Sequence, residues 1–328
     1  MDLRKLNIAI VAGGFSSEKE ISLQSAAQIE KWLDSNRYNT YIIKILNDGW
    51  YHEHNSKRFN INKNDFTLQI NNKHIAFDFV IIAIHGDPGE NGKLQSYFDL
   101  INIPYSTSPA HIEALTFDKY LSKLYLQPFG IHTAKSILIT KNTKKDYSQK
   151  EIIKKLGLPL IVKPNASGSS FGVTLVHNSN ELPNAINKAF EEDNNSIIIE
   201  EYIKGIEVSC GVFYDGNELL TFPPTEIVSE TEFFDYEAKY LGKSQEITPA
   251  RLNNKMLQTI QKESAKIYQA FQCEGIVRVD FIIKENTPYY LEINTVPGMS
   301  SESIFPKQAK VKGISMTEIF DKLITQKR

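Results

Sequence analysis

A predicted β-hairpin near the C-terminal end restricts the fold of this chain more than any other feature of its sequence. The segment reads GIVRVDFIIKENTPYYLEINTVPGMS (residues 275–300). A turn at Glu285–Pro288 sets a register in which Asp280 lies opposite Glu292. Like charges directly opposite each other destabilise a sheet. The two carboxylates therefore need a role that offsets their repulsion, and a divalent cation bound between them is such a role.

The alternation of side chains along the two strands predicts a polar face and an apolar face. We expect the polar face to carry Arg278, Asp280, Glu292 and Asn294, and the apolar face to carry Val279, Phe281, Leu291 and Ile293. Oxygen ligands without His or Cys suit Mg²⁺ or Mn²⁺, which also bind the phosphate oxygens of nucleotides. The alternative is a solvated polar face on which the arginine bridges the two acids. The asparagine and the adjoining TVPGMS loop favour the metal site.

The glycine-serine loop NASGSSFGV, which follows the strand IVKP, indicates a phosphate site. Small residues let backbone amides approach phosphate oxygens, and Gly168 and Gly172 permit the backbone angles that such a loop needs. Lys163 at the strand end can neutralise one phosphate. The loop is not the GxxxxGK[ST] motif, because its lysine precedes the glycines and no helix follows. Taken alone, a flexible turn explains it about as well.

The N-terminal part alternates strands with helices, the pattern of a doubly wound α/β domain. The apolar run Leu6–Ala12 predicts a strand buried on both faces. A pair of glycines ends this strand, and a helix is expected over Ser17–Asp34, with Ser17 and Glu20 at capping-box spacing. Further elements are expected at 40–46 and 77–84 (strands) and near 94–100 (helix). Residues 60–74 are rich in Asn and Lys and are expected to form a surface hairpin or loop.

After Pro109 the pattern changes to that of α+β units. The expected strands lie at 134–139, 160–163, 173–176 and 196–201. The expected helices lie at 118–127, 149–155, 179–192 and 254–271. Three domains are predicted, with residues 1–117, 118–205 and 206–328, each within the usual size range.

Composition excludes several classes of function. The net charge is −2 and the pI is near 6.4, so no basic field points to nucleic acid or to acidic lipid. Cys210 and Cys273 lie far apart, which argues against a disulfide scaffold or a structural zinc site and fits a reducing compartment. No stretch approaches the roughly 20 apolar residues of a membrane span. We therefore predict a soluble, cytoplasmic protein.

Other polar residues have ordinary explanations when each is considered alone. Lys119 would be an exposed lysine at a helix start, and Glu18 would complement a helix dipole. His85 ends an apolar strand and is expected to be structural, with a role in a site as the alternative, because α/β sites gather at strand ends. The glycine pair before Glu18 lacks GxGxxG, and an acid there would repel a pyrophosphate, which disfavours a nicotinamide-dependent dehydrogenase. The long polar segment 225–249 predicts a lid over a ligand.

Taken together, the sequence resembles the D-alanine–D-alanine ligases of bacterial cell-wall synthesis, which are ATP-grasp enzymes, over nearly its full length. The matching stretches are GGFSSEKEISL, AIHGDPGENG, FDKYLSK, IVKPNASGSSFGV, DYEAKY, VRVDF and LEINTVPGMSSESIFP. VRVDF with LEIN alone would indicate only an ATP-grasp enzyme; the combination is specific. The resemblance implies that residues 1–117 form an α/β substrate domain and that the lobes 118–205 and 206–328 enclose ATP.

The resemblance also implies roles for individual residues. The residues expected to bind ATP are Lys119 and Lys163 at the phosphates, Glu200 and Glu207 at the adenine and ribose, and the lid residue Lys239 at the γ-phosphate. The expected metal ligands are Asp280, Glu292 and Asn294. The residues expected at D-alanine are Glu18 for the first ammonium, Ser169 and Tyr240 as hydrogen-bond partners of Glu18, Arg278 and Gly298 for the tetrahedral intermediate, and Ser303 for the second carboxylate.

By the same resemblance the cofactors are ATP and Mg²⁺ or Mn²⁺, the substrates are two D-alanine molecules, and the assembly is a homodimer. The chain departs from the family pattern at Phe234, where a tyrosine is common, and near Ser167, where a charged residue is common. Both departures bear on lid contacts. Tyr240 favours an amine as the second substrate, because relatives that make D-alanyl-D-lactate lose this tyrosine. The alternatives are a ligase for D-serine or D-lactate and a nucleotide-binding module without turnover.

Overall fold

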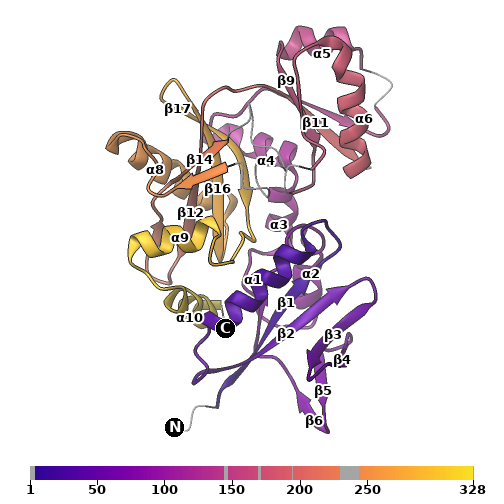
Figure 1. The fold of residues 1–328 in the computed structure, drawn as a ribbon, viewed down its shortest axis with the longest axis vertical. Helices are drawn as coiled ribbons and strands as arrows, with labels where there is room; N and C mark the ends of the chain where they lie inside the picture. The colour runs from indigo at the N-terminus through magenta and orange to yellow at the C-terminus, as the bar shows by residue number, and fades with distance from the viewer. Residues whose placement is uncertain (1–3, 144–146, 169–170, 194, 230–243, 328) are drawn as a thin grey trace.

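The computed structural model describes residues 4–143, 147–168, 171–193, 195–229 and 244–327, which form three β-sheets with helices packed against them. Figure 1 shows the sheet of the N-terminal unit at one end of the molecule and the small central unit, with helices α5 and α6, at the other. The sheet of the C-terminal unit lies between them. The mixed α/β architecture matches the fold class predicted from the sequence.

The N-terminal unit is built on a seven-stranded sheet in the order β6-β5-β4-β3-β2-β1-β7. Its strands are β1 (Leu6–Gly13), β2 (Tyr38–Leu46), β3 (Gly49–His54), β4 (Lys57–Asn62), β5 (Thr67–Ile70), β6 (Lys73–Ile75) and β7 (Phe79–Ile82). Its helices are α1 (Lys19–Trp32), α2 (Lys93–Leu100) and α3 (Ala110–Phe117). Strand β1 is parallel to both β2 and β7, and its residues 8–12 are completely buried, as the sequence predicts.

One expectation for this unit is confirmed in part and another is wrong. Residues 60–74 form the predicted hairpin structure, because β4 pairs with β5 and β5 with β6 in antiparallel register. They do not lie only on the surface, because the side chains of Phe66 and Leu68 are completely buried. The capping box at the start of α1 does not form. The N-cap is Glu18, it makes no side-chain cap, and its own N–H donates to the Ser16 hydroxyl at 3.3 Å. The helix therefore begins two residues later than predicted, and Ser17 is not in capping position.

The central unit carries a four-stranded sheet in the order β10-β9-β11-β8. Its elements are α4 (Lys119–Leu126), the 3₁₀ helix η1 (Gln127–Phe129), β8 (Ser136–Thr140), α5 (Gln149–Leu156), β9 (Leu160–Pro164), β10 (Thr174–Val176), η2 (Ser179–Glu181), α6 (Leu182–Glu192) and β11 (Ser196–Glu201). Helices α5 and α6 close one small apolar core with these strands. The elements agree with the predicted ones to within a few residues.

The C-terminal unit carries a six-stranded sheet in which β15-β14-β12-β16-β17 are neighbours and β13 pairs with β12. Its elements are β12 (Ile206–Tyr214), β13 (Leu219–Thr221), β14 (Thr225–Ser229), β15 (Ser244–Ile247), α8 (Asn254–Phe271), β16 (Ile276–Lys284), β17 (Thr287–Asn294), α9 (Ile304–Lys312) and α10 (Met316–Lys327). Helix α8 has the predicted bounds, because the Asn253 side chain accepts a hydrogen bond from the Met256 N–H and Gln272 ends the helix in a left-handed conformation.

The sequence did not predict helices α9 and α10, and α10 makes the tertiary contact that joins the two ends of the chain. The rings of Trp32 in α1 and Phe320 in α10 stack with centroids 6.3 Å apart. Asp321 accepts a hydrogen bond from the Tyr38 hydroxyl at 2.7 Å. One apolar core is consequently shared by the N-terminal sheet and the C-terminal helices. The boundaries at 117/118 and 205/206 stay a prediction.

The hairpin register confirms the predicted pairs, Asp280 with Glu292 and Arg278 with Asn294. The turn itself is a tight two-residue one, with Glu285 and Asn286 both at positive φ (51° and 65°). A regular hairpin on that turn would place Leu291 opposite Asp280. A β-bulge between Asp280 and Phe281 shifts the register by one residue and restores the carboxylate pair.

The same bulge makes the expectation for Leu291 wrong. Leu291 lines the cavity described below instead of entering the apolar core, and Tyr290, 1% exposed, fills the core position. None of the described helices is both long and apolar enough to cross a membrane.

Candidate active site

A cavity of about 460 Å³ opens where the three units meet. Eleven of the fourteen residues predicted as site residues line it: Glu18, Lys119, Lys163, Glu200, Glu207, Arg278, Asp280, Glu292, Asn294, Gly298 and Ser303. The other three, Ser169, Lys239 and Tyr240, lie outside the described residues. The cavity therefore collects groups that are separated by as many as 285 positions in the sequence, from Glu18 to Ser303.

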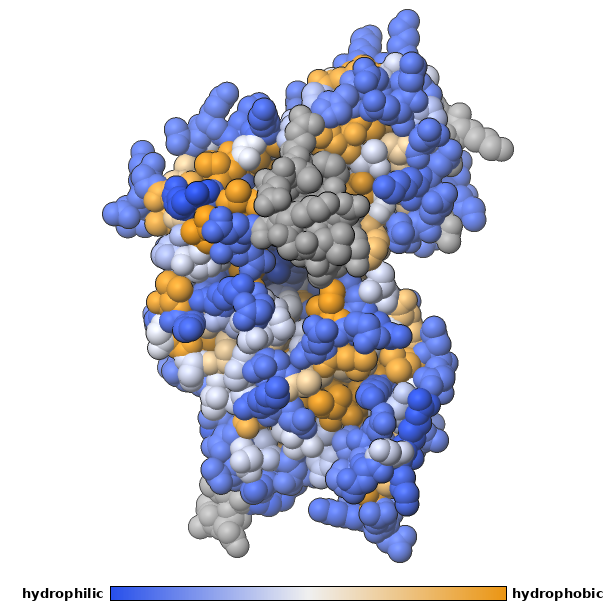
Figure 2. All heavy atoms as spheres, in the orientation of Figure 1, coloured by the Kyte–Doolittle hydropathy of each residue, from blue (hydrophilic) through white to orange (hydrophobic). Residues whose placement is uncertain are grey.

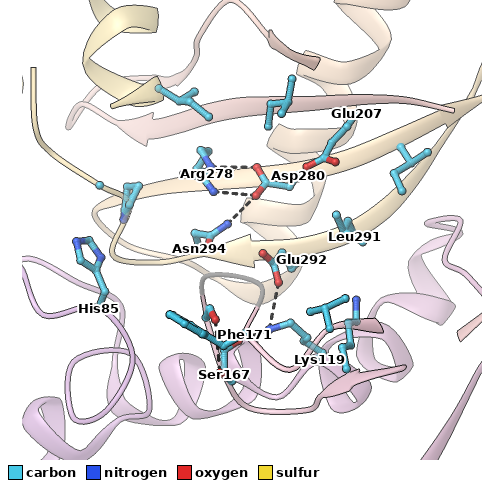
Figure 3. A pocket seen from close by; sticks show the side chains of 18 of the residues that line it. His85, Lys119, Ser167, Phe171, Glu207, Arg278, Asp280, Leu291, Glu292 and Asn294 are labelled. Atoms are coloured by element: carbon cyan, nitrogen blue, oxygen red, sulfur yellow. Dashed lines mark hydrogen bonds and ion pairs between the residues drawn. The ribbon is translucent and has the colours of Figure 1, made fainter. Parts of the chain in front are cut away.

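The polar face of the hairpin forms one wall of this cavity (Figure 3). Arg278 donates to both oxygens of Asp280, at 3.0 and 2.9 Å, and Asn294 Nδ2 donates to Asp280 Oδ2 at 2.9 Å. The Ser209 hydroxyl of β12 donates to Asp280 Oδ1 at 2.5 Å. Asp280, 4% exposed, is thus held in one orientation by three neighbours.

Charge balance at this wall follows from the same contacts. Burial disfavours the charged guanidinium, but the adjacent Asp280 carboxylate outweighs it and raises the pKa of Arg278 above its ordinary value. Glu292, on the neighbouring strand, pairs with Lys119 Nζ at 3.1 Å. The alternative prediction is a polar face on which the arginine bridges both acids. The structure agrees with it for one acid: Arg278 pairs with Asp280, whereas Glu292 pairs with Lys119 of another unit.

A buried chain of charges forms the opposite wall. Lys163 Nζ lies 2.8 Å from Glu200 Oε2, and the second oxygen of Glu200 contacts Nζ of Lys123. The side chains of these three residues are 8%, 4% and 2% exposed, in that order. Burial, with Lys119 as a further positive neighbour, lowers the pKa of Lys163 to about 8. Burial also lowers the pKa of Lys123 well below its ordinary value.

Lys123 is a site residue that the sequence reasoning missed. It lies four positions after Lys119 in helix α4, and residues at that spacing share one face of a helix. That spacing was the available signal. Both lysines line the cavity, so one helix face supplies two cations to the site, one toward the hairpin and one toward Glu200.

The phosphate loop approaches the N-terminal unit closely. A Cβ placed on Gly168 would lie 2.4 Å from Glu18 Oε2, so a residue with a side chain would clash with the carboxylate there. Lys119 Nζ donates to the Ser167 carbonyl of the same loop at 2.7 Å. Glu18, 9% exposed, lies at the start of α1. The first helix, the glycine-serine loop and α4 therefore meet at one side of the cavity.

The loop after β17 is held by buried side chains, two of which, His85 and Glu90, also line the cavity. The Val296 carbonyl lies 2.8 Å from Nδ1 of His85. This histidine therefore has the structural contact that was expected and also lies at the site. Glu90 accepts from the N–H groups of Gly86 and Val296, at 2.6 and 3.3 Å, and burial raises its pKa to about 7. Glu113, completely buried, contacts the Thr295 hydroxyl. Neither Glu90 nor Glu113 was predicted from the sequence, because only the folded structure brings each acid into contact with the loop after β17.

The same loop ends at the N-terminus of α9. The hydroxyl of Ser303, the N-cap residue, lies 3.0 Å from the Ser300 N–H and 2.9 Å from the Ser300 hydroxyl. A Cβ on Gly298 would lie 3.0 Å from the Ser303 hydroxyl oxygen. Free backbone N–H groups at a helix N-terminus favour anions. This corner of the cavity suits a carboxylate.

The donor set of the hairpin fits a divalent ion. Two carboxylates and one amide supply oxygen ligands only, which suits Mg²⁺ or Mn²⁺. Asp280 would share its oxygens between the ion and its present donors, whereas the Glu292 side chain is 29% exposed toward the cavity. Among the described residues no three His, Cys, Asp or Glu side chains form a group that could hold a metal, and the metal ligands stay a prediction.

Three units meet around a cavity in which both walls carry paired cations and carboxylates. This arrangement defines a nucleotide-dependent ligase of the ATP-grasp class. Sequence models of the D-Ala–D-Ala ligase N-terminus and C-terminus match residues 7–108 and 125–325. The chain belongs to the D-alanine–D-alanine ligase family.

Individual relatives agree with this placement. The D-alanine–D-alanine ligase of Flavobacterium johnsoniae is 46% identical over 319 residues, with 97% of this chain and 98% of the relative covered. That of Azobacteroides pseudotrichonymphae is 47% identical, with 97% and 98% covered. Among solved structures, the VanG D-Ala:D-Ser ligase from Enterococcus faecalis has a TM-score of 0.89 at 33% identity, with 99% of this chain and 100% of that chain covered. A Bacillus anthracis D-alanine–D-alanine ligase complexed with ATP has a TM-score of 0.78 at 32% identity, with 98% and 97% covered.

Proposed function

We propose that the cavity joins two D-alanine molecules through an acyl-phosphate intermediate, with the residues named above in the roles that the family pattern implies. The family membership supports the overall reaction, which is the ATP-dependent ligation of D-alanine to D-alanine for peptidoglycan synthesis. The observation that supports the site assignment is the convergence of Lys119, Lys163, Arg278 and the paired hairpin carboxylates on one cavity.

The first step brings two anions together. The carboxylate of the first D-alanine attacks the γ-phosphorus of ATP, the bond to ADP breaks, and an acyl phosphate forms. Lys119 and Lys163 bind phosphate oxygens, and Glu18 binds the ammonium of the first D-alanine. A bound divalent ion, held by Asp280, Glu292 and Asn294, would supply charge neutralisation at the phosphate oxygens. The work of the chain in this step is to offset negative charge in a cavity from which water is excluded.

In the second step the neutral amine of the second D-alanine attacks the acyl carbon, and phosphate leaves. Ser303, at the N-terminus of α9, holds the carboxylate of that molecule. Arg278 stabilises the oxyanion of the tetrahedral intermediate together with the backbone at Gly298. The guanidinium is fixed by its two hydrogen bonds to Asp280, so no reorganisation is needed when the charge develops.

Ser169, Lys239 and Tyr240 complete the proposal as residues of the loop and the lid that close the site. Exclusion of water is needed because water would hydrolyse the acyl phosphate. A homodimer and a cytoplasmic location are further parts of the proposal that follow from the family pattern. On the face seen in Figure 2 most side chains are hydrophilic, which fits a protein that works in water.

The decisive experiment measures ADP release with ATP, Mg²⁺ and a panel of D- and L-amino acids. We expect release that depends on D-alanine, with D-alanyl-D-alanine as the product. D-serine or D-lactate as a better second substrate would favour the alternative ligases. ATP binding without amino-acid-dependent ADP release would leave a nucleotide-binding module, and the proposed reaction would be wrong.

A further inference from the structure

Asn165 is a buried residue next to the site that the proposed reaction does not use. It follows β9 directly, is 1% exposed, and does not line the cavity. Its side chain nevertheless makes two hydrogen bonds. Oδ1 accepts from the Tyr120 N–H at 3.0 Å, and Nδ2 donates to the Ser196 hydroxyl at 3.2 Å. A fully buried amide with both ends engaged joins segments that are distant in sequence.

The first contact lies at the start of helix α4. The first N–H groups of a helix have no partner within the helix and need an acceptor from elsewhere. Here the Lys119 N–H donates to the Asn165 carbonyl at 3.1 Å, the Tyr120 N–H to the Asn165 side chain, and the Leu121 N–H to the Asp118 carboxylate at 2.8 Å. Two of these three amides are therefore satisfied by one residue, which belongs to the strand end of another element.

The second contact fixes that strand end to the sheet. The Asn165 N–H donates to the Ser196 carbonyl at 3.2 Å, beside the side-chain bond to the Ser196 hydroxyl. The next residue is held too, because the Ala166 N–H donates to the Asp193 carboxylate at 3.1 Å. The root of the phosphate loop is thus tied to β11 at one side and to α4 at the other.

The groups that this junction places are those of the nucleotide site. Lys163 lies two residues before Asn165, and the Ser167 carbonyl, two residues after it, accepts from Lys119 Nζ at 2.7 Å. Lys119 is itself the first residue of α4. Both ends of Lys119, its N–H and its ammonium, therefore contact the segment 165–167. A shift of α4 relative to the loop would move one phosphate lysine relative to the other.

We propose that Asn165 is a positioning residue for nucleotide binding, which fixes the distance between Lys119 and Lys163 by capping α4 from the root of the phosphate loop. The proposal rests on the proposed function, because it takes the two lysines as the phosphate ligands. It predicts a selective effect. Removal of the Asn165 side chain weakens ATP binding and leaves the affinity for D-alanine unchanged, since the hydrogen bonds of that side chain go to Tyr120 and Ser196 and not to Glu18 or Ser303.

The test compares N165A with N178A in the full chain. Asn178 forms a capping box with Glu181 in the same central unit, but at η2, away from the cavity. N178A therefore controls for the general loss of a helix cap. Binding of a non-hydrolysable ATP analogue with Mg²⁺ is measured by calorimetry, KM for ATP and for D-alanine by ADP release, and the melting temperature by circular dichroism.

We expect N165A to raise the dissociation constant of the analogue and the KM for ATP about tenfold or more, with the KM for D-alanine within twofold of the wild type. N178A lowers the melting temperature and leaves both ATP constants unchanged. S196A, which removes only the acceptor of Nδ2, raises the dissociation constant about threefold and replaces N165A in the test if N165A does not fold.

Wild-type nucleotide affinity in N165A, or in S196A where it replaces N165A, would overturn the proposal. So would an equal loss of affinity in N178A. If the wild type binds nucleotide but shows no D-alanine-dependent ADP release, the proposed reaction fails by itself.

Discussion

Replacement of Glu292 by glutamine tests the wall of the cavity that the β16–β17 hairpin forms. The substitution keeps the shape of the side chain but removes a charge that faces Asp280 and pairs with Lys119 at 3.1 Å. At an effective dielectric constant of about 20 that ion pair has a gross Coulomb energy of about 5 kcal/mol. Desolvation and side-chain entropy offset most of this energy for a carboxylate that is 29% exposed. We therefore expect a loss of only about 1 kcal/mol in the free energy of unfolding.

The expected loss of catalysis is larger than the loss of stability. A group that offsets charge in the transition state contributes about 3 kcal/mol, which corresponds to a fall in kcat/KM of roughly a hundredfold or more. The assay is D-alanine-dependent ADP release at several Mg²⁺ concentrations, with urea denaturation in parallel. We expect the fall to be largest at limiting Mg²⁺, because the glutamine weakens the ion's site.

The matched control is Glu302→Gln, an identical change at another residue of the same cavity. Glu302 is 85% exposed, and its partner Lys307 lies 3.5 Å away. This variant keeps most of its activity if charge at the hairpin, and not charge in the cavity generally, is what matters. Near wild-type turnover in Glu292→Gln would refute the assignment of the hairpin as the metal and phosphate wall. Equal losses in the two variants would refute its specificity.

Two further changes have expected outcomes that follow from buried or paired charges. Lys123→Met breaks a buried ion pair with Glu200 and should lower the free energy of unfolding by about 3 kcal/mol, as measured by urea denaturation. The same change at exposed Lys150 should have little effect. Equal stability of the two variants would contradict the reasoning from the buried pair. Asp215 accepts from Lys322 and from two backbone N–H groups, and these contacts lower its pKa from 3.8 to about 2. A lowered pKa stabilises the fold above about pH 4, and this contribution disappears as the pH falls toward 2. Asp215→Asn should therefore be less stable than the wild type at pH 7 and equally stable near pH 2, and a stability difference that does not change with pH would contradict this.

Much of the site was predictable from local pattern. Alternation along the hairpin put Asp280 and Glu292 on one face, and small residues after Lys163 marked a loop that phosphate can approach. Within each strand or loop these features depend on residues a few positions apart, where backbone geometry decides which way a side chain points. The combination of such segments in a fixed order also carried the resemblance to the family, which the comparisons confirm.

The register of the hairpin shows where local pattern is insufficient. Its two-residue turn would by itself oppose Asp280 with Leu291, and the predicted carboxylate pair exists because a bulge adds one residue to β17. A β-bulge inserts one residue into a strand and re-aims side chains, and bulges are common next to active sites. Tyr290 enters the core while Leu291 faces the cavity, and neither surrounding can be read from the strand alone.

The sequence by itself determined which four residues form the polar face of the hairpin, where the phosphate loop lies and to which family the chain belongs. The tertiary structure decided which buried polar groups meet: Lys123 with Glu200, Glu113 with Thr295, and Asn165 with the start of α4. It also decided that α10 packs against α1. The physical reason is that these contacts join residues far apart in the chain. Their energies come from burial and from the satisfaction of polar groups, which exist only after the units have packed.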